Sequence, residues 1–134
     1  MPQALIISLL VGFGGFAGAL CRYGLSVFSQ RFSFDWPVGT LAANMLGCLC
    51  MGVIMALAAR GEVLSPELRL ALATGFCGGF TTMSSMIYET SEMLRLNEYL
   101  HAAMYAFGTI FLSMAMFVCG MLAVRLIVKL NHIY

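Results

Sequence analysis

Charged residues are scarce in this sequence. Asp, Glu, Lys and Arg together make up 10% of its 134 residues, whereas a soluble domain carries about 25%. Apolar residues make up 61% of the chain, and its mean hydropathy is +0.93. No packed core of this length could hide so much apolar surface from water, so we predict a single transmembrane domain over residues 1–134. The net charge of +1 argues against a nucleic-acid partner.

The sequence also lacks the patterns of a disulfide-rich, metal-binding or catalytic protein. Its five cysteines lie in apolar runs and form no CxxC pair or Cys/His metal spacing, so we interpret them as buried small apolar residues. His101 and His132 have no cysteine or carboxylate at triad or metal spacing, and we predict that the chain is not an enzyme. The N-terminus has no basic segment before its apolar run, so we expect a retained first span rather than a signal peptide.

Four apolar segments are long enough to cross a bilayer, which takes about 20 residues. They cover about residues 4–30, 36–59, 68–93 and 99–128. Pro37 suits the first helical position of the second segment, and Ser65 followed by Pro66 gives the third segment an N-cap and a proline at its first position. The sequence therefore predicts an all-α membrane protein with four transmembrane helices.

The basic residues are divided weakly between the two sides of the membrane. An even number of spans places both termini on one side, where four basic residues would lie: Arg60, Arg69, Arg125 and Lys129. The opposite side would carry Arg31 and Arg95, with Arg22 deeper in the first span. Because the positive-inside rule normally produces a clear excess on one side, this weak bias permits insertion in both orientations. An antiparallel homodimer of dual topology is then possible.

Polar residues in the first two spans need a partner or a water-filled pathway. Arg22 can snorkel to the membrane surface or line a vestibule. In the second span, Thr40 and Asn44 are four residues apart and share one helix face. The Asn44 amide can bond a neighbouring helix or offer its NH2 group to a passing anion. We interpret the glycines of these two spans as sites of close helix packing.

The centre of the third span has the most unusual composition. Gly78 and Gly79 weaken the helix, and four hydroxyl residues follow them: Thr81, Thr82, Ser84 and Ser85. Hydroxyl groups can bond backbone groups that a helix break has freed, and helices broken at the midplane expose backbone dipoles to ions. We expect a helix broken at mid-membrane, with a kinked but purely structural helix as the alternative. Glu89 lies near the helix face of Met86, toward the end of this span.

The fourth span carries three hydroxyl residues, Tyr105, Thr109 and Ser113, spaced every four residues in an otherwise apolar helix. This spacing forms a continuous hydroxyl stripe. Because hydroxyl groups both donate and accept, the stripe can line a narrow wet path or form interhelical hydrogen bonds. Four short spans are too few to enclose a wide pore, so a pathway would be narrow and built in an oligomer.

Three segments occur together in the order and spacing of a known family. They are GGFAGA at residues 14–19, PVGTL at 37–41 and GFCGGFTT at 75–82. With these segments the sequence resembles the Fluc (CrcB) fluoride channels over essentially its whole length. The resemblance implies a dual-topology antiparallel homodimer with two narrow fluoride pathways, each using residues of both subunits.

The resemblance also implies a set of site residues. Backbone carbonyls of Gly78 and Thr81 are expected to hold a structural sodium ion at the dimer centre. The fluoride pathway is expected to use five residues: Asn44, Ser84, Tyr105, Thr109 and Ser113. Arg22 and Glu89 match further polar positions of the family's pattern.

Met83 and Met86 stand where the family places two phenylalanines. Phenylalanine rings can meet fluoride with their electropositive edges, and a methionine S-methyl group replaces such an edge only crudely. We expect this difference to affect ion coordination and rate more than function. The implied function is passive export of fluoride across a bacterial inner membrane through a pore too narrow for chloride. The alternatives are a small four-span drug/proton antiporter and a structural subunit of a larger helix bundle.

Overall fold

The computed structural model describes residues 2–32, 36–61 and 64–131. All regular structure within these ranges is helical, and seven elements follow one another: α1 (Pro2–Ser29), α2 (Val38–Ala58), α3 (Pro66–Leu70), the π-helix η1 (Ala71–Cys77), α4 (Gly78–Phe80), α5 (Met83–Arg95) and α6 (Tyr99–Asn131). Elements α3 to α5 together form one span. The described residues therefore contain four apolar spans long enough to cross a membrane: Pro2–Ser29, Val38–Ala58, Pro66–Arg95 and Tyr99–Leu130. The predicted all-α, four-span architecture is confirmed.

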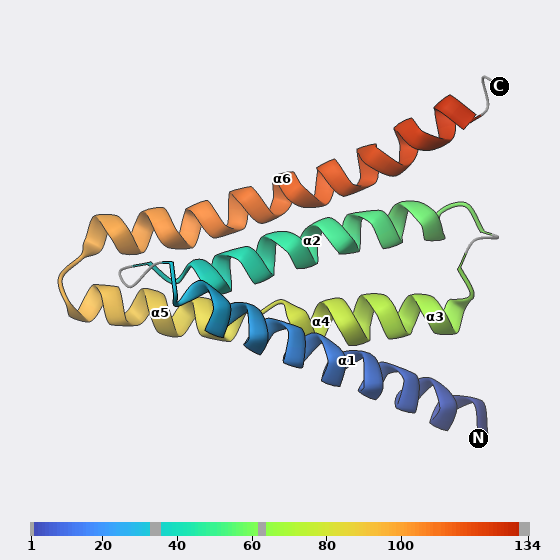
Figure 1. The fold of residues 1–134 in the computed structure, drawn as a ribbon, viewed down its shortest axis with the longest axis horizontal. Helices are drawn as coiled ribbons and strands as arrows, with labels where there is room; N and C mark the ends of the chain where they lie inside the picture. Colours follow the sequence, from blue (N-terminus) through green and yellow to red (C-terminus); the bar gives the residue numbers. More distant parts are fainter. Residues whose placement is uncertain (1, 33–35, 62–63, 132–134) are drawn as a thin grey trace.

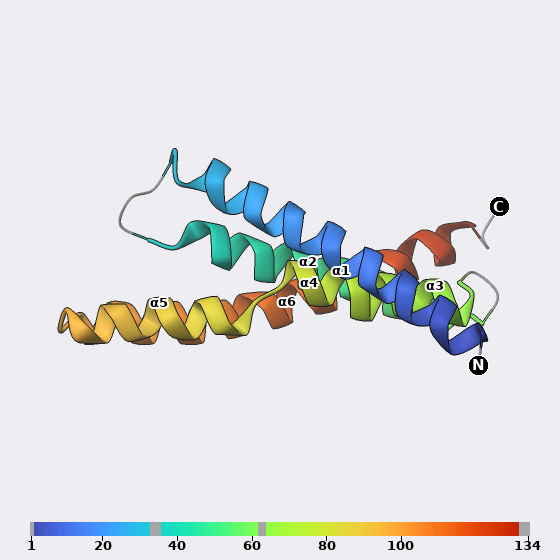
Figure 2. The ribbon, with the colours of Figure 1, turned by 90° about the horizontal axis from the view of Figure 1, so that it is seen from below.

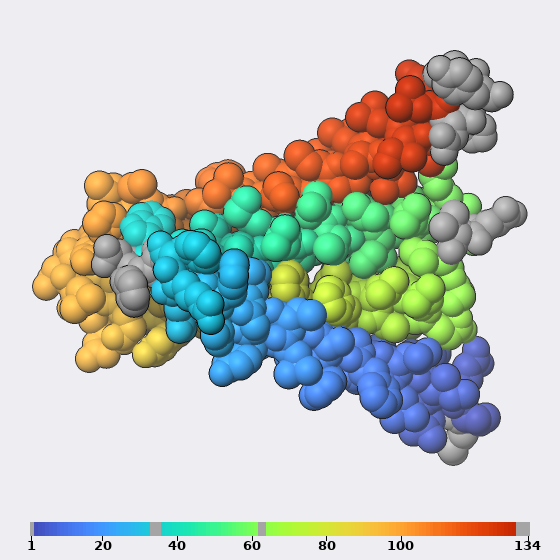
Figure 3. All heavy atoms as spheres, viewed as in Figure 1, coloured from blue at the N-terminus to red at the C-terminus, as the bar shows by residue number. Residues whose placement is uncertain are grey.

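The spans form two pairs that meet in the middle of the molecule. Helix α2 packs along α6, and α1 packs against η1 and α4. Figure 1 shows that α1 begins and α6 ends at the same end of the molecule, as an even number of spans requires. The space-filling view in Figure 3 shows α1 and the end of α6 standing apart at that end. At the opposite end, α1 and α2 diverge from α5 and α6, as seen in Figure 2.

The starts of two spans test the expected capping residues. Ser65 accepts a hydrogen bond of 3.2 Å from the Leu68 N–H, and Pro66 occupies the first helical position of α3, as predicted. Pro37 is the N-cap residue of α2, which begins at Val38, so the expected position of this proline was wrong by one residue. Its carbonyl accepts the first helical bond, from the Leu41 N–H.

Glycines allow α1 to approach the third span closely. A Cβ atom on Gly18 would lie closer than 3.0 Å to the Phe76 carbonyl oxygen and the Phe80 backbone nitrogen, and one on Gly79 would lie as close to the Gly15 carbonyl oxygen. A similar approach of Gly52 to the backbone of Phe117 joins α2 to α6. The interpretation of the span-one glycines as close packing sites is confirmed for Gly14 and Gly18, where the third span leaves no room for a side chain, but it is wrong for Gly12, which has no atom within 4 Å of its Cβ position.

The helical path of the third span is interrupted at two threonines. Thr81 (φ −81°, ψ 156°) and Thr82 (φ −151°, ψ 117°) are extended and separate α4 from α5. Gly78 and Gly79, where the sequence suggested a weak helix, stay helical in α4. The interruption therefore follows the glycines, and packing against α1 rather than helix weakness accounts for Gly79.

Candidate functional site

The side chain of Asn44, from α2, joins the backbone of the interrupted segment. Its Nδ2 donates to the Thr82 carbonyl at 3.0 Å, and its Oδ1 accepts from the Thr82 N–H at 2.7 Å. Both residues are 8% exposed. A buried backbone pair outside a helix needs such partners. Of the two roles considered for Asn44, bonding a neighbouring helix is the one formed here, and its amide retains one further N–H hydrogen.

Threonine hydroxyl groups satisfy other backbone groups of the same segment. Thr82 is the N-cap of α5, and its Oγ1 accepts from the Ser85 N–H at 3.2 Å. The Ser84 and Ser85 hydroxyl groups lie 3.2 and 3.1 Å from the same oxygen. Thr81 donates from its Oγ1 to the Cys77 carbonyl at 2.9 Å. The expected bonding of freed backbone groups by hydroxyl residues is therefore confirmed for Thr82, whereas the Ser84 and Ser85 hydroxyl groups contact the Thr82 side chain.

The interruption takes the regular helical donors from the carbonyls that precede it, including those of Gly78 and Thr81. In a continuous helix, the Thr82 N–H would bond the Gly78 carbonyl, and the Ser85 N–H would bond the Thr81 carbonyl. Here these two donors bond the Asn44 side chain and the Thr82 hydroxyl instead. The carbonyls of Gly78 and Thr81 therefore lose their regular helical donors, and Gly78 is exposed on the surface of the single chain.

Arg22 connects α1 to the carbonyl group of Gly79 in the third span. Its Nε donates to the Gly79 carbonyl at 3.2 Å, and the side chain is partly buried. A deep arginine needs such an acceptor because its charge is costly inside a bilayer. In this chain a carbonyl of the third span supplies it.

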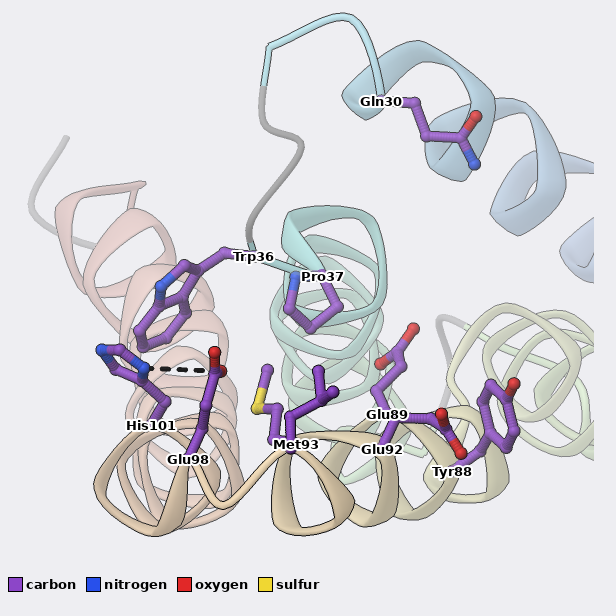
Figure 4. A pocket seen from close by; sticks show the side chains of 10 residues that line it. Gln30, Trp36, Pro37, Tyr88, Glu89, Glu92, Met93, Glu98 and His101 are labelled. Carbon is purple, nitrogen blue, oxygen red and sulfur yellow. Dashed lines mark ion pairs between the residues drawn. The ribbon is translucent and has the colours of Figure 1, made fainter.

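Glu89 links three spans through its carboxyl group. Thr40 of α2 donates to Oε1 at 2.7 Å, and Tyr105 of α6 donates to Oε2 at 2.5 Å. Thr40 and Asn44 therefore face the third span together, as their spacing predicted. Figure 4 shows Glu89 beside a wide cavity of about 790 Å³ that also has Trp36, Glu92 and His101 in its wall.

The hydroxyl stripe of α6 is buried but its members bond differently. Tyr105, Thr109 and Ser113 are 1%, 2% and 8% exposed. Tyr105 bonds Glu89 across the helices, whereas Thr109 donates to the Tyr105 carbonyl of its own helix at 2.7 Å. The Ser113 hydroxyl is buried with no hydrogen-bond partner among the described residues. Interhelical bonding thus accounts for Tyr105 alone.

A second cavity, of about 230 Å³, lies beside the interruption, and we call it the central cavity. Its wall includes polar groups from α2 and α6 and sulfur-containing side chains from α2 and α5: Asn44, Thr109, Ser113, Cys48, Met83 and Met86. Met86 is 5% exposed and belongs to a buried cluster, whereas Met83 is 70% exposed on the single chain. Five of the predicted pathway residues therefore share one cavity.

Comparison with known proteins assigns the family. The model of a family described as CrcB-like protein, Camphor Resistance (CrcB), matches residues 9–121. The chain belongs to the CrcB family. This match covers most of the chain and includes the interrupted segment, Asn44 and the hydroxyl stripe.

Several curated relatives of this CrcB protein carry the name fluoride-specific ion channel FluC. The relative from Prosthecochloris aestuarii is 45% identical over 93% of this chain and 98% of its own length. Those from Chlorobium phaeobacteroides (strain BS1) and Chlorobaculum tepidum are 46% and 43% identical, over 82% and 88% of this chain and 86% and 94% of their own lengths. These names describe channels, so they agree with the prediction that the chain is not an enzyme and give no support to the antiporter alternative.

Thr81, predicted as a sodium-site residue, also lies in the wall of the central cavity. The remaining predicted pathway residues of this CrcB protein lie outside that wall. Tyr105 and Glu89 form the bonded group next to it, and Ser84 is exposed on α5 beside Thr82. Arg22 lies on α1, bonded to the third span.

Sequence reasoning missed the roles of three residues. Thr40 was noted for its face but not as a partner of Glu89, although its four-residue spacing from Asn44 placed it correctly. Thr82 was grouped with other hydroxyl residues, and no local signal distinguishes its backbone as the partner of Asn44. Cys48 was interpreted as a small apolar residue, whereas it lies in the wall of the central cavity.

Proposed function

We propose that this chain is one subunit of a passive, fluoride-selective channel that exports fluoride from the cytoplasm across a bacterial inner membrane. The subunit pairs with a second copy in antiparallel orientation, and the interruption at Thr81 and Thr82 lies at the middle of the bilayer. The support is the similarity to proteins named fluoride-specific ion channels over nearly the full chain, together with the weak charge bias of the loops.

The central cavity forms part of the proposed fluoride path. Leaving a buried hydroxyl group without a partner costs about 1–3 kcal/mol, so the orphaned hydroxyl of Ser113 is ready to donate to an anion. The free amide hydrogen of Asn44 is a second donor on the same wall. Donors that replace the hydration shell of fluoride in a narrow, largely apolar space would favour it over larger anions.

The other pathway residues extend this route. Thr109 and Tyr105 continue the stripe toward Glu89, whose carboxyl group orients the Tyr105 hydroxyl by accepting from it. Met83 and Met86 bound the path on the side of α5, and their S-methyl groups meet the ion in place of aromatic ring edges. Three residues complete the proposed route outside the central cavity: Ser84, Glu89 and Arg22.

A sodium ion is proposed as a structural cofactor at the dimer centre. The carbonyl oxygens of Gly78 and Thr81 are suitable ligands for sodium, because they have lost their regular helical hydrogen bonds. Hard oxygen atoms also suit a hard cation. An unpaired carbonyl on a bilayer-embedded surface is costly, and Gly78 is exposed on the single chain. The carbonyls of two subunits would share the ion, whose charge offsets their dipoles.

Fluoride efflux from proteoliposomes, followed with a fluoride electrode, tests the channel. We expect rapid efflux down a fluoride gradient, no comparable chloride efflux, and no requirement for a proton gradient. Tyr105→Phe should slow efflux because it removes the hydroxyl that bonds Glu89. A well-folded dimer that conducts no fluoride, or that moves it only when a proton gradient is imposed, would contradict a passive channel.

A further inference from the structure

The wall of the central cavity brings together three sulfur atoms from two spans. Cys48 of α2 supplies a free thiol, and Met83 and Met86 of α5 supply two thioethers. Cys48 and Met86 are largely enclosed by the chain, whereas Met83 reaches outward. Methionine side chains are unbranched and flexible, so the two thioethers of this wall can adjust their positions around a ligand.

A polar group without a partner lies next to the thiol. The Ser113 hydroxyl is buried, makes no well-formed hydrogen bond among the described residues, and lies in the same wall as Cys48, whose thiol is a polar neighbour of this hydroxyl. Cys48 and Ser113 also line an adjoining cavity of about 400 Å³. The site thus has free volume, an unsatisfied oxygen and three soft donor atoms.

These donors select a particular class of ligand. Thiolate and thioether sulfur atoms favour soft monovalent cations such as Cu⁺, whereas carboxylate and carbonyl oxygens suit hard cations. In the part of the chain that the structure describes, no group of three His, Cys, Asp or Glu side chains could hold a metal ion. A soft cation is therefore the metal class that the donors of this cavity fit.

We propose that the central cavity binds one Cu⁺ or Ag⁺ ion through the sulfur atoms of Cys48, Met83 and Met86, and that the bound ion obstructs the ion path. On binding, the Cys48 thiol gives its proton to water and its sulfur bonds the metal. The thiolate and the monovalent cation together carry no net charge, which limits the cost of placing the pair in an apolar cavity. Phenylalanine at positions 83 and 86 would offer no sulfur atom. The proposed site therefore depends on the two methionines of this sequence and is not implied by its resemblance to the fluoride channels.

Silver binding to the purified protein in detergent tests the site independently of transport. Calorimetric titration with silver nitrate in chloride-free buffer should show one fewer bound ion per chain in Cys48→Ala than in the wild type. The double variant Met83→Leu/Met86→Leu keeps the side-chain volume at both positions. It should weaken, at least tenfold, the affinity for the silver ion whose binding requires Cys48. Met104→Leu, at an exposed position outside the cavity, is the matched control and should leave binding unchanged.

Cys119→Ala provides the corresponding control for the thiol, because Cys119 is exposed on α6 and absent from the wall of the central cavity. The Cys119→Ala variant should also bind one silver ion fewer than the wild type. The affinity for the ion bound at Cys119 should not change when Met83 and Met86 are replaced. Equal silver binding by the wild type and Cys48→Ala would overturn the site. Unchanged affinity in the double methionine variant would overturn the role of the thioethers.

The obstruction rests on the proposed channel function and is measured separately. Silver should reduce fluoride efflux from proteoliposomes at least tenfold in the wild type, and Cys48→Ala should resist this inhibition. If silver binds through Cys48 but efflux continues, the obstruction is wrong. If there is no efflux before silver is added, the proposed function fails while the titration still decides the site.

Discussion

Replacing Asn44 with leucine keeps a similar side-chain shape but removes both hydrogen bonds to the backbone of Thr82. The Thr82 carbonyl, at the N-cap of α5, still has a donor from the first turn of that helix. The Thr82 N–H has none, and its residue is 8% exposed. One orphaned buried donor costs about 1–3 kcal/mol, so we expect the free energy of unfolding to fall by about that amount.

Denaturant-induced unfolding in detergent, followed by the fluorescence of the single tryptophan, measures this loss. Trp36 lies against the rings of His101 and Tyr105, with centroids 5.9 and 6.4 Å away, so its emission reports whether the spans are packed. Thr81→Val is the matched control. It also removes a hydrogen bond, but the Cys77 carbonyl that accepts it keeps the Thr81 N–H as a donor at 2.9 Å.

The control should therefore change stability much less than Asn44→Leu. If the two variants are equally stable, or if Asn44→Leu matches the wild type, the Asn44 amide does not hold the interrupted segment. Fluoride efflux of Asn44→Leu should fall as well, since the same change removes a donor from the central cavity.

Three further predictions use the same unfolding and efflux assays. Gly79→Ala should lower the free energy of unfolding by about 1–3 kcal/mol because its Cβ would press on the backbone of α1, whereas Gly12→Ala, with nothing within 4 Å, should not. Met83→Phe and Met86→Phe should both retain conduction, but only the buried Met86 site should lose about 1–3 kcal/mol through overpacking; equal losses would contradict the difference in burial. Ser113→Ala removes a hydroxyl that bonds nothing within the described chain, so efflux should fall without loss of stability.

Features that depend on local spacing were predictable from the sequence. The four spans follow from the length of the apolar runs, and the cap at Ser65 follows from its proline neighbour. The shared face of Thr40 and Asn44 and the burial of the α6 hydroxyl stripe follow from helical periodicity. Each of these depends only on residues within one continuous segment of the chain.

Features that depend on tertiary packing were not predictable. Two roles for Asn44 stayed open because its partner lies 38 residues away in the chain. Glycine propensity suggested weakness at Gly78 and Gly79, yet α4 stays helical there, and the path changes where Asn44 takes over the Thr82 N–H. Met83 and Met86 are three residues apart, but one is exposed and the other buried. The antiparallel dimer and the sodium ion stay predictions, since they depend on a second copy.

The bond between Asn44 and Thr82 has a consequence for how the protein enters the membrane during synthesis. The third span is the least hydropathic of the four candidate spans, and its extended segment brings a backbone N–H that its own helix cannot satisfy. Asn44 belongs to the preceding span and is synthesised first. We therefore expect the third span to complete its insertion only when Asn44 of the second span is in place to accept from the Thr82 N–H.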